Sequence, residues 1–142
     1  MAELGSDECL ELLERQQVGR LAVSMSNLPD IFPINYVVDR GRVVFRTAEG
    51  TKLAAAVLGR GVAFEVDGVD EASGEAWSVI VKGYAVELQR MHEQFAAAGL
   101  PLFPWHAAPK QRYVRIDPVQ MTGRRFTVVG PEWWSDPRGG RP

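Results

Sequence analysis

The fold of this chain is decided by one stretch, Ile31-Phe-Pro-Ile-Asn-Tyr-Val-Val-Asp-Arg-Gly-Arg-Val-Val-Phe-Arg-Thr-Ala-Glu-Gly-Thr-Lys52. Residues 31–38 and 42–47 are rich in β-branched and aromatic side chains, which favour strands. Between them, Asp39-Arg-Gly41 is typical of a tight hairpin turn. The stretch therefore predicts two antiparallel strands, followed by a short helix over 51–58 that Thr51 caps.

Cationic and hydroxyl side chains gather where the second of these strands ends. Arg46 and Lys52 supply two cations, and Thr47 and Thr51 supply two hydroxyls. Proteins bind phosphate with cations and with the free N–H groups at a helix N-terminus. The sequence therefore predicts a phosphate site at this junction, and the alternative is a surface Arg and Lys beside an ordinary hairpin. Three residues upstream are placed to face a planar ring joined to that phosphate: Pro33, Asn35 and Tyr36.

Composition restricts the class of protein. The 142 residues fit one domain, and 46% hydrophobic content supports a sizeable core. A net charge of −2 provides no large basic field for nucleic acid. No run of 18 apolar residues is present, so we expect no membrane span. The acidic start Met1-Ala-Glu-Leu-Gly-Ser-Asp-Glu does not resemble a signal peptide, and the one cysteine, Cys9, cannot form an intrachain disulfide. We therefore expect a cytoplasmic protein.

The remaining patterns predict a mainly β fold. A helix is expected over 6–17, with Cys9 in its apolar stripe, and a turn over 27–30 around Pro29. A polar loop is expected over 68–75 and another helix over 89–98. Further strands are expected over 20–25, 62–67, 77–88, 112–116 and 121–129. About six strands with short turns favour a small antiparallel barrel with peripheral helices over a doubly wound sheet.

Five motifs in order carry a resemblance to a known family. They are Pro33-Ile-Asn-Tyr36, Val44-Phe-Arg-Thr47, Gly50-Thr-Lys52, Val62-Ala-Phe-Glu-Val66 and Trp77-Ser-Val-Ile-Val-Lys-Gly83. From about Cys9 to Arg125 the chain resembles the flavin-binding split barrels, the pyridoxamine 5′-phosphate oxidase-like proteins. The resemblance implies a six-stranded antiparallel split β-barrel over 1–130. Residues 131–142 are rich in Pro, Gly and Arg and are expected to form a C-terminal tail. The resemblance also implies a homodimer that binds flavin mononucleotide (FMN) at the subunit interface.

The resemblance assigns residues to this cofactor. Arg46 and Lys52 would bind the phosphate, and Thr47 would contact the phosphate or the ribityl chain. Ser78 stands where some relatives have a glutamine, and Arg124 stands where the second subunit reaches the flavin. The expected cofactor contacts are Pro33, Asn35, Tyr36, Arg46, Thr47, Thr51, Lys52, Trp77, Ser78 and Arg124.

The function implied is a flavin-dependent oxidoreductase with a small-molecule substrate that the sequence does not identify. Authentic pyridoxamine phosphate oxidases carry a C-terminal Arg-Leu-His-Asp-Arg-like segment that this chain lacks, so we do not expect that activity. No catalytic acid or base stands out, and His92, His106 and Cys9 lack metal-ligand spacing. The alternatives are a flavin carrier or sensor without turnover, or a deazaflavin or haem protein on the same fold. FMN is favoured over a polyglutamylated deazaflavin because no Lys/Arg cluster follows the short helix.

Overall fold

The computed structural model describes residues 2–48, 50–88 and 111–128. These residues form a mainly β structure with two short helices, which confirms the predicted fold class. The elements, in chain order, are β1 (Ala2–Glu3), α1 (Ser6–Arg15), β2 (Val18–Met25), β3 (Leu28–Asp39), β4 (Arg42–Ala48), α2 (Lys52–Val57), β5 (Gly61–Asp70), β6 (Glu75–Glu87) and β7 (Gln111–Thr127).

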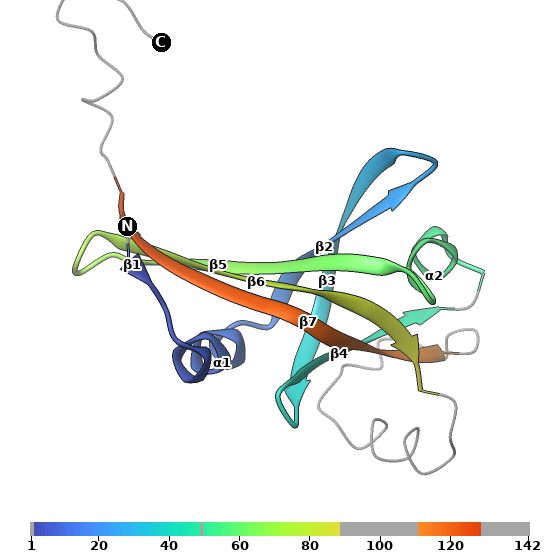
Figure 1. Cartoon of the computed structure of the whole chain (residues 1–142), viewed down its shortest axis with the longest axis horizontal. Helices are drawn as coiled ribbons and strands as arrows, with labels where there is room; N and C mark the ends of the chain where they lie inside the picture. Colours follow the sequence, from blue (N-terminus) through green and yellow to red (C-terminus); the bar gives the residue numbers. More distant parts are fainter. Residues whose placement is uncertain (1, 49, 89–110, 129–142) are drawn as a thin grey trace, which may run out of the picture.

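The strands form one antiparallel sheet that closes on itself. Its order is β1-β7-β4-β3-β2-β5-β6, and β6 pairs in turn with β7 to complete the ring. One edge of β7 pairs with β6 from Val114 to Thr127. Its other edge pairs first with β4, over Gln111 to Arg115, and then only with the two residues of β1. In Figure 1 the long strands β5, β6 and β7 run together, with α1 beside them and α2 at the opposite end. The barrel is therefore split along β7, beside α1.

Two tight turns fix the register of the central hairpins. Arg40 (φ 52°) and Gly41 (φ 78°) join β3 to β4, as the Asp39-Arg-Gly41 pattern predicts. The turn between β2 and β3 consists of Ser26 (φ 51°) and Asn27 (φ 64°). This turn is tighter than the one expected over 27–30, because an Asn adopts the left-handed conformation at low cost. Pro29 and Asp30 consequently belong to β3 and are not turn residues.

The prediction of separate strands over 112–116 and 121–129 is wrong. One continuous strand, β7, crosses Pro118, and a register shift at Lys82/Gly83 of β6 accommodates the irregularity. A Cβ on Gly83 would collide with the Asp117 carbonyl, so the bulge requires glycine there. The predicted polar loop over 68–75 is also too long, because β5 continues to Asp70 and β6 begins at Glu75.

The core fills the barrel and extends beneath α1. Cys9, Leu12 and Leu13 of α1 are each 1% exposed, whereas Val18, at the start of β2, is 51% exposed. Gly123 of β7 provides the space that Cys9 occupies. Burial and the neighbouring Glu8 raise the pKa of the Cys9 thiol. The predicted core position of Cys9 is therefore confirmed. The helix expected over 89–98, both histidines and the 131–142 tail lie outside the described residues.

Candidate functional site

The two hydroxyls expected at the phosphate site bond to each other. The oxygens of Thr47 and Thr51 are 3.1 Å apart, and Thr47 is only 4% exposed. Thr51 donates to the Ala48 carbonyl at 2.7 Å and accepts from the Ala54 N–H at 3.1 Å. Because a hydroxyl has one proton, Thr47 must be the donor within the pair. Both protons are thus already used, and an anion would have to compete for either of them.

Thr51 is the N-cap of α2, as predicted. The helix has only six residues, and its Ala54 N–H is already bonded to the Thr51 side chain. A helix this short contributes little dipole, and its end offers few free donors. Any affinity of this junction for phosphate therefore depends on side-chain cations.

Lys52 is the exposed cation of the junction. Its side chain is 75% exposed, and its Nζ lies 3.2 Å from Oδ2 of Asp30 on β3. The other carboxylate oxygen of Asp30 accepts the Ile31 backbone N–H at 3.0 Å. Asp30 was not predicted as a partner, because Pro29 indicated a turn over 27–30. The two side chains therefore form an exposed ion pair between β3 and α2.

Arg46 lies on the other face of β4 from Thr47. Val43 and Phe45 point into the barrel core, and Val44 packs in a separate cluster with Val37, Tyr113 and Leu88. By the alternation of a strand, Arg46 shares the outer face with Val44, and its register partner on β7 is Tyr113. Within the described ranges Arg46 makes no side-chain hydrogen bond or ion pair. Its charge is therefore available to a ligand.

Three residues of β3 are expected to contact the cofactor ring, and they do not all lie on the same face of the strand. Pro33 and Asn35 are exposed on the outer face, opposite Arg20 and Val18 of β2. Tyr36 is 3% exposed in the core, where its hydroxyl donates to the Leu13 carbonyl and its ring packs edge-on against Phe64. The structure thus places Pro33 and Asn35 where a ligand can reach them. It places the Tyr36 side chain in the core, where it joins α1 to the barrel.

Two of the three expected cofactor contacts on β6 and β7 lie side by side, and the third does not join them. Ser78 and Arg124 are register partners, and Arg124 is exposed. Trp77 is 6% exposed and lies in the core, where its indole covers Gly68 of β5. Its side chain therefore does not flank Ser78 on the outer face. Strands β2 and β5 separate Ser78 of β6 from Pro33 and Asn35 of β3.

A charged cluster that was not predicted from the sequence occupies the face between these two groups. Arg20 of β2 donates to Glu65 at 2.7 Å and to Asp67 at 2.6 Å, both on β5. Burial and the hydrogen bond with Asp67 raise the pKa of Glu65, and Arg20 opposes this shift. Arg20 is also the register partner of Pro33. The pairing of β2 with β5 brings the cluster together, and no local sequence motif indicates it.

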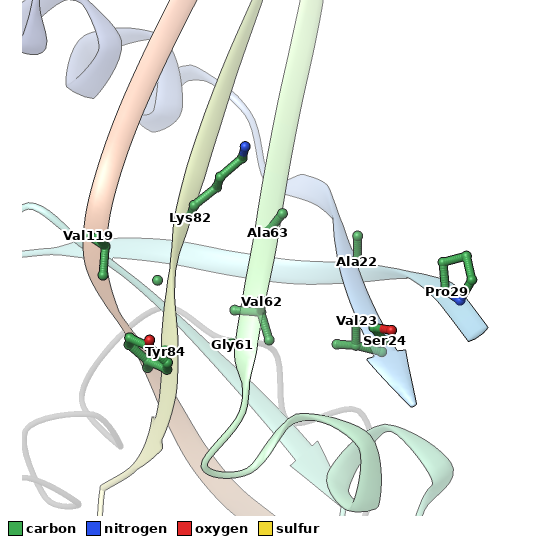
Figure 2. Close-up of a pocket in the computed structure, with 11 residues that line it drawn as sticks. Ala22, Val23, Ser24, Pro29, Gly61, Val62, Ala63, Lys82, Tyr84 and Val119 are labelled. Carbon is green, nitrogen blue, oxygen red and sulfur yellow. The ribbon is translucent and has the colours of Figure 1, made fainter. Parts of the chain in front are cut away.

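An open, largely apolar groove of about 500 Å³ lies further along the same face. Ala22, Ala63 and Lys82 form its central row on three neighbouring strands, with Tyr84 and Val119 alongside (Figure 2). Ala22 and Ala63 have small side chains, and Lys82 makes no side-chain hydrogen bond or ion pair within the described residues. The outer face thus combines a shallow apolar surface with an available cation. No group of three metal-ligating side chains occurs within the described residues.

Comparisons with known proteins agree with this architecture. A family model described as pyridoxamine 5′-phosphate oxidase matches residues 5–125. An uncharacterized protein of Mycobacterium tuberculosis is 36% identical over 133 residues, which cover 90% of this chain and 87% of that protein. No helix of the described residues is long and apolar enough to cross a membrane.

Two solved structures are similar along nearly their whole length. The FAD binding protein from Mycobacterium smegmatis is 41% identical with a TM-score of 0.84, covering 90% of this chain and all of that one. A putative pyridoxamine 5′-phosphate oxidase from Corynebacterium glutamicum is 40% identical with a TM-score of 0.76, covering 91% and 95%. The split-barrel topology is therefore common to this chain and to these two proteins.

Proposed function

Because this chain belongs to the pyridoxamine 5′-phosphate oxidase family, we propose that it binds a flavin nucleotide and serves as a cytoplasmic flavin-dependent oxidoreductase. The observation that carries the proposal is its similarity to the M. smegmatis FAD binding protein over that chain's full length. FMN is the cofactor we propose, and FAD contains the same riboflavin 5′-phosphate unit. A site for that unit is compatible with either nucleotide.

The residues of this chain would bind and orient the cofactor. Arg46 and Lys52 are the cations at the end of β4 that would bind its phosphate. Pro33 and Asn35 are exposed on the outer face, where they would lie along the ring. When bound, the flavin supplies the redox chemistry, and the protein supplies its position and electrostatic surroundings. The substrate is a small molecule that would stack on the accessible face of the ring.

A second copy of the chain would complete the site. From β3 to β6 there are three strand spacings, or about 14 Å along the sheet. Ser78 of one copy therefore lies three strands from its own Pro33 and Asn35, and Arg124 lies where β7 pairs with β1 and not with β4. In a two-fold dimer the same surface serves both subunits, so residues from one copy can reach the cofactor of the other. This geometry supports a homodimer with the cofactor at the interface.

Cofactor analysis of the purified protein tests the proposal. We expect flavin absorbance, and mass spectrometry of the molecule released by heat should distinguish FMN, FAD and a deazaflavin. A Soret band instead of flavin absorbance would identify a haem protein. Light scattering at micromolar concentration should give the mass of a dimer, and a monomer would contradict the shared site.

The phosphate assignment requires a matched pair of titrations. Hydrogen bonds to charged groups contribute roughly 1.5–3 kcal/mol, so Arg46→Ala should weaken FMN binding by about 10- to 100-fold. Riboflavin, which lacks the phosphate, should bind wild type and variant alike. Arg40→Ala, in the exposed β3–β4 turn, is the control and should change neither affinity. An equal loss for riboflavin and FMN would show that Arg46 does not contact the phosphate.

Turnover separates an enzyme from a carrier. Reduction of the bound flavin by a nicotinamide or quinol donor would support the oxidoreductase. A flavin that no such donor reduces would favour a carrier or sensor. We expect little or no hydrogen peroxide from pyridoxamine 5′-phosphate, because that substrate carries a second phosphate that needs a cationic pocket of its own.

A further inference from the structure

The ion pair between Asp30 and Lys52 joins two elements at the proposed phosphate site. Asp30 lies on β3, opposite Val23 of β2, and Lys52 is the first residue of α2. Asp30 Oδ1 accepts the Ile31 N–H, which orients the carboxylate, and Oδ2 lies 3.2 Å from the Lys52 ammonium. The carboxylate is therefore held by its own strand in a position that faces the cation.

We propose that Asp30 is a built-in competitor of the cofactor phosphate, which neutralises Lys52 in the free protein and lowers the affinity of the site for anions. This inference rests on the proposed function, because it assumes that Lys52 binds the phosphate. Asp30 would act through Lys52 and is thus a positioning residue. Its presence would lower the preference for FMN over riboflavin, which has no phosphate to compete with it.

The exposure of both side chains indicates that the exchange is feasible. The Lys52 side chain is 75% exposed and that of Asp30 is 38% exposed, so water screens their attraction. A ligand phosphate can therefore take the place of Asp30 at the ammonium. To do so, the phosphate must break the contact between Lys52 and Asp30. Breaking an exposed ion pair of this kind changes a binding constant by up to about fivefold.

The test compares Asp30→Asn with Asp39→Asn in the full chain. Both variants remove one negative charge from β3, but Asp39 lies at the opposite end of the strand, beside the β3–β4 turn. For each protein, dissociation constants are measured for FMN, riboflavin and inorganic phosphate at low and high salt. We expect Asp30→Asn to bind FMN and phosphate about two- to fivefold more tightly, with riboflavin unchanged. The gain should shrink at high salt, and Asp39→Asn should change each constant less than twofold.

Two further variants keep the test decisive. Asp30→Ser retains an oxygen that can accept the Ile31 N–H and should give the same gain if Asp30→Asn does not fold. In a Lys52→Gln background the gain should vanish, because the carboxylate then has no cation to neutralise. Each variant is checked for cooperative thermal unfolding before titration.

The outcomes separate this inference from the proposed function. Unchanged or weaker FMN binding by Asp30→Asn and Asp30→Ser, together with a loss of binding in Lys52→Gln, would overturn the inference alone. A gain that persists in the Lys52→Gln background would also overturn it, because the effect would not act through Lys52. If neither FMN nor inorganic phosphate binds to any of the proteins, both the inference and the phosphate site are wrong.

Discussion

Replacing Tyr36 by Phe should lower the free energy of unfolding by about 1–3 kcal/mol. The Tyr36 hydroxyl donates to the carbonyl of Leu13, which lies in the last turn of α1. Carbonyls of a last turn lack the N–H partner that a following turn would supply. Tyr36 is 3% exposed and Leu13 is 1% exposed, so water cannot easily replace the lost hydroxyl. The variant leaves a buried acceptor unsatisfied where α1 meets the barrel.

Urea denaturation of the cofactor-free protein, at one fixed protein concentration, measures this loss of stability. The Tyr36→Phe midpoint should fall while the m-value stays the same, because the surface exposed on unfolding is unchanged. Tyr84→Phe is the control: Tyr84 is 58% exposed, and its change should stay within about 0.5 kcal/mol.

The pH dependence gives an independent check. Burial raises the pKa of Tyr36 above its ordinary value, so the folded state keeps the hydroxyl proton at a pH where the unfolded state loses it. The hydroxyl's contribution is fully present below about pH 10, the unfolded pKa. Above that, wild type should lose about 1.4 kcal/mol per pH unit relative to Tyr36→Phe. A difference below 0.5 kcal/mol at pH 7, or one that stays constant from pH 9 to pH 11, would refute the reasoning.

Three further predictions test the fold around the site. Gly83→Ala should destabilise the protein by about 1–3 kcal/mol, because its Cβ would collide with the Asp117 backbone; Gly61→Ala, whose nearest neighbour would be 3.8 Å away, should cost far less in the same denaturation assay. Thr51→Ala removes the N-cap of α2 and should cost about 0.5–2 kcal/mol, read from the thermal midpoint. Cys9, 1% exposed and with a raised thiol pKa, should react with Ellman's reagent slowly in buffer and rapidly in denaturant; equal rates would contradict its burial.

The sequence predicted those features that depend on neighbours in the chain. The β3–β4 hairpin follows from Asp39-Arg-Gly41, and the start of α2 follows from the capping hydroxyl of Thr51. The bulge in β7 beside Pro118 was not predicted, because it depends on how β6 approaches β7 in space. The Arg20–Glu65–Asp67 cluster was not predicted for the same reason, since two strands distant in sequence form it. Asp30 was missed because Pro29 indicated a turn, whereas Ser26 and Asn27 form the actual one.

The sequence could have predicted more accurately which candidate site residues share a face of the sheet. Side chains alternate along a strand, so Pro33 and Asn35 share one face while Tyr36 takes the other. The same rule separates Trp77 from Ser78. In each of these pairs the bulky aromatic side chain, Tyr36 or Trp77, lies on the inner face of the sheet, and its smaller polar neighbour does not. A family motif written as consecutive residues does not show this division, because it reports position along the chain and not the direction of each side chain.

The alternation also decides where along β4 a shared phosphate can lie. Arg46 and Thr47 are consecutive, so they project to opposite faces, and a ligand flat against either face can contact only one of them. The strand ends at Ala48. Lys52 stands just past that point and faces Asp30 of the neighbouring strand β3. An anion that contacts both Arg46 and Lys52 must therefore lie across the end of β4. We accordingly place the proposed phosphate there, at the junction with α2, and the ring along β3.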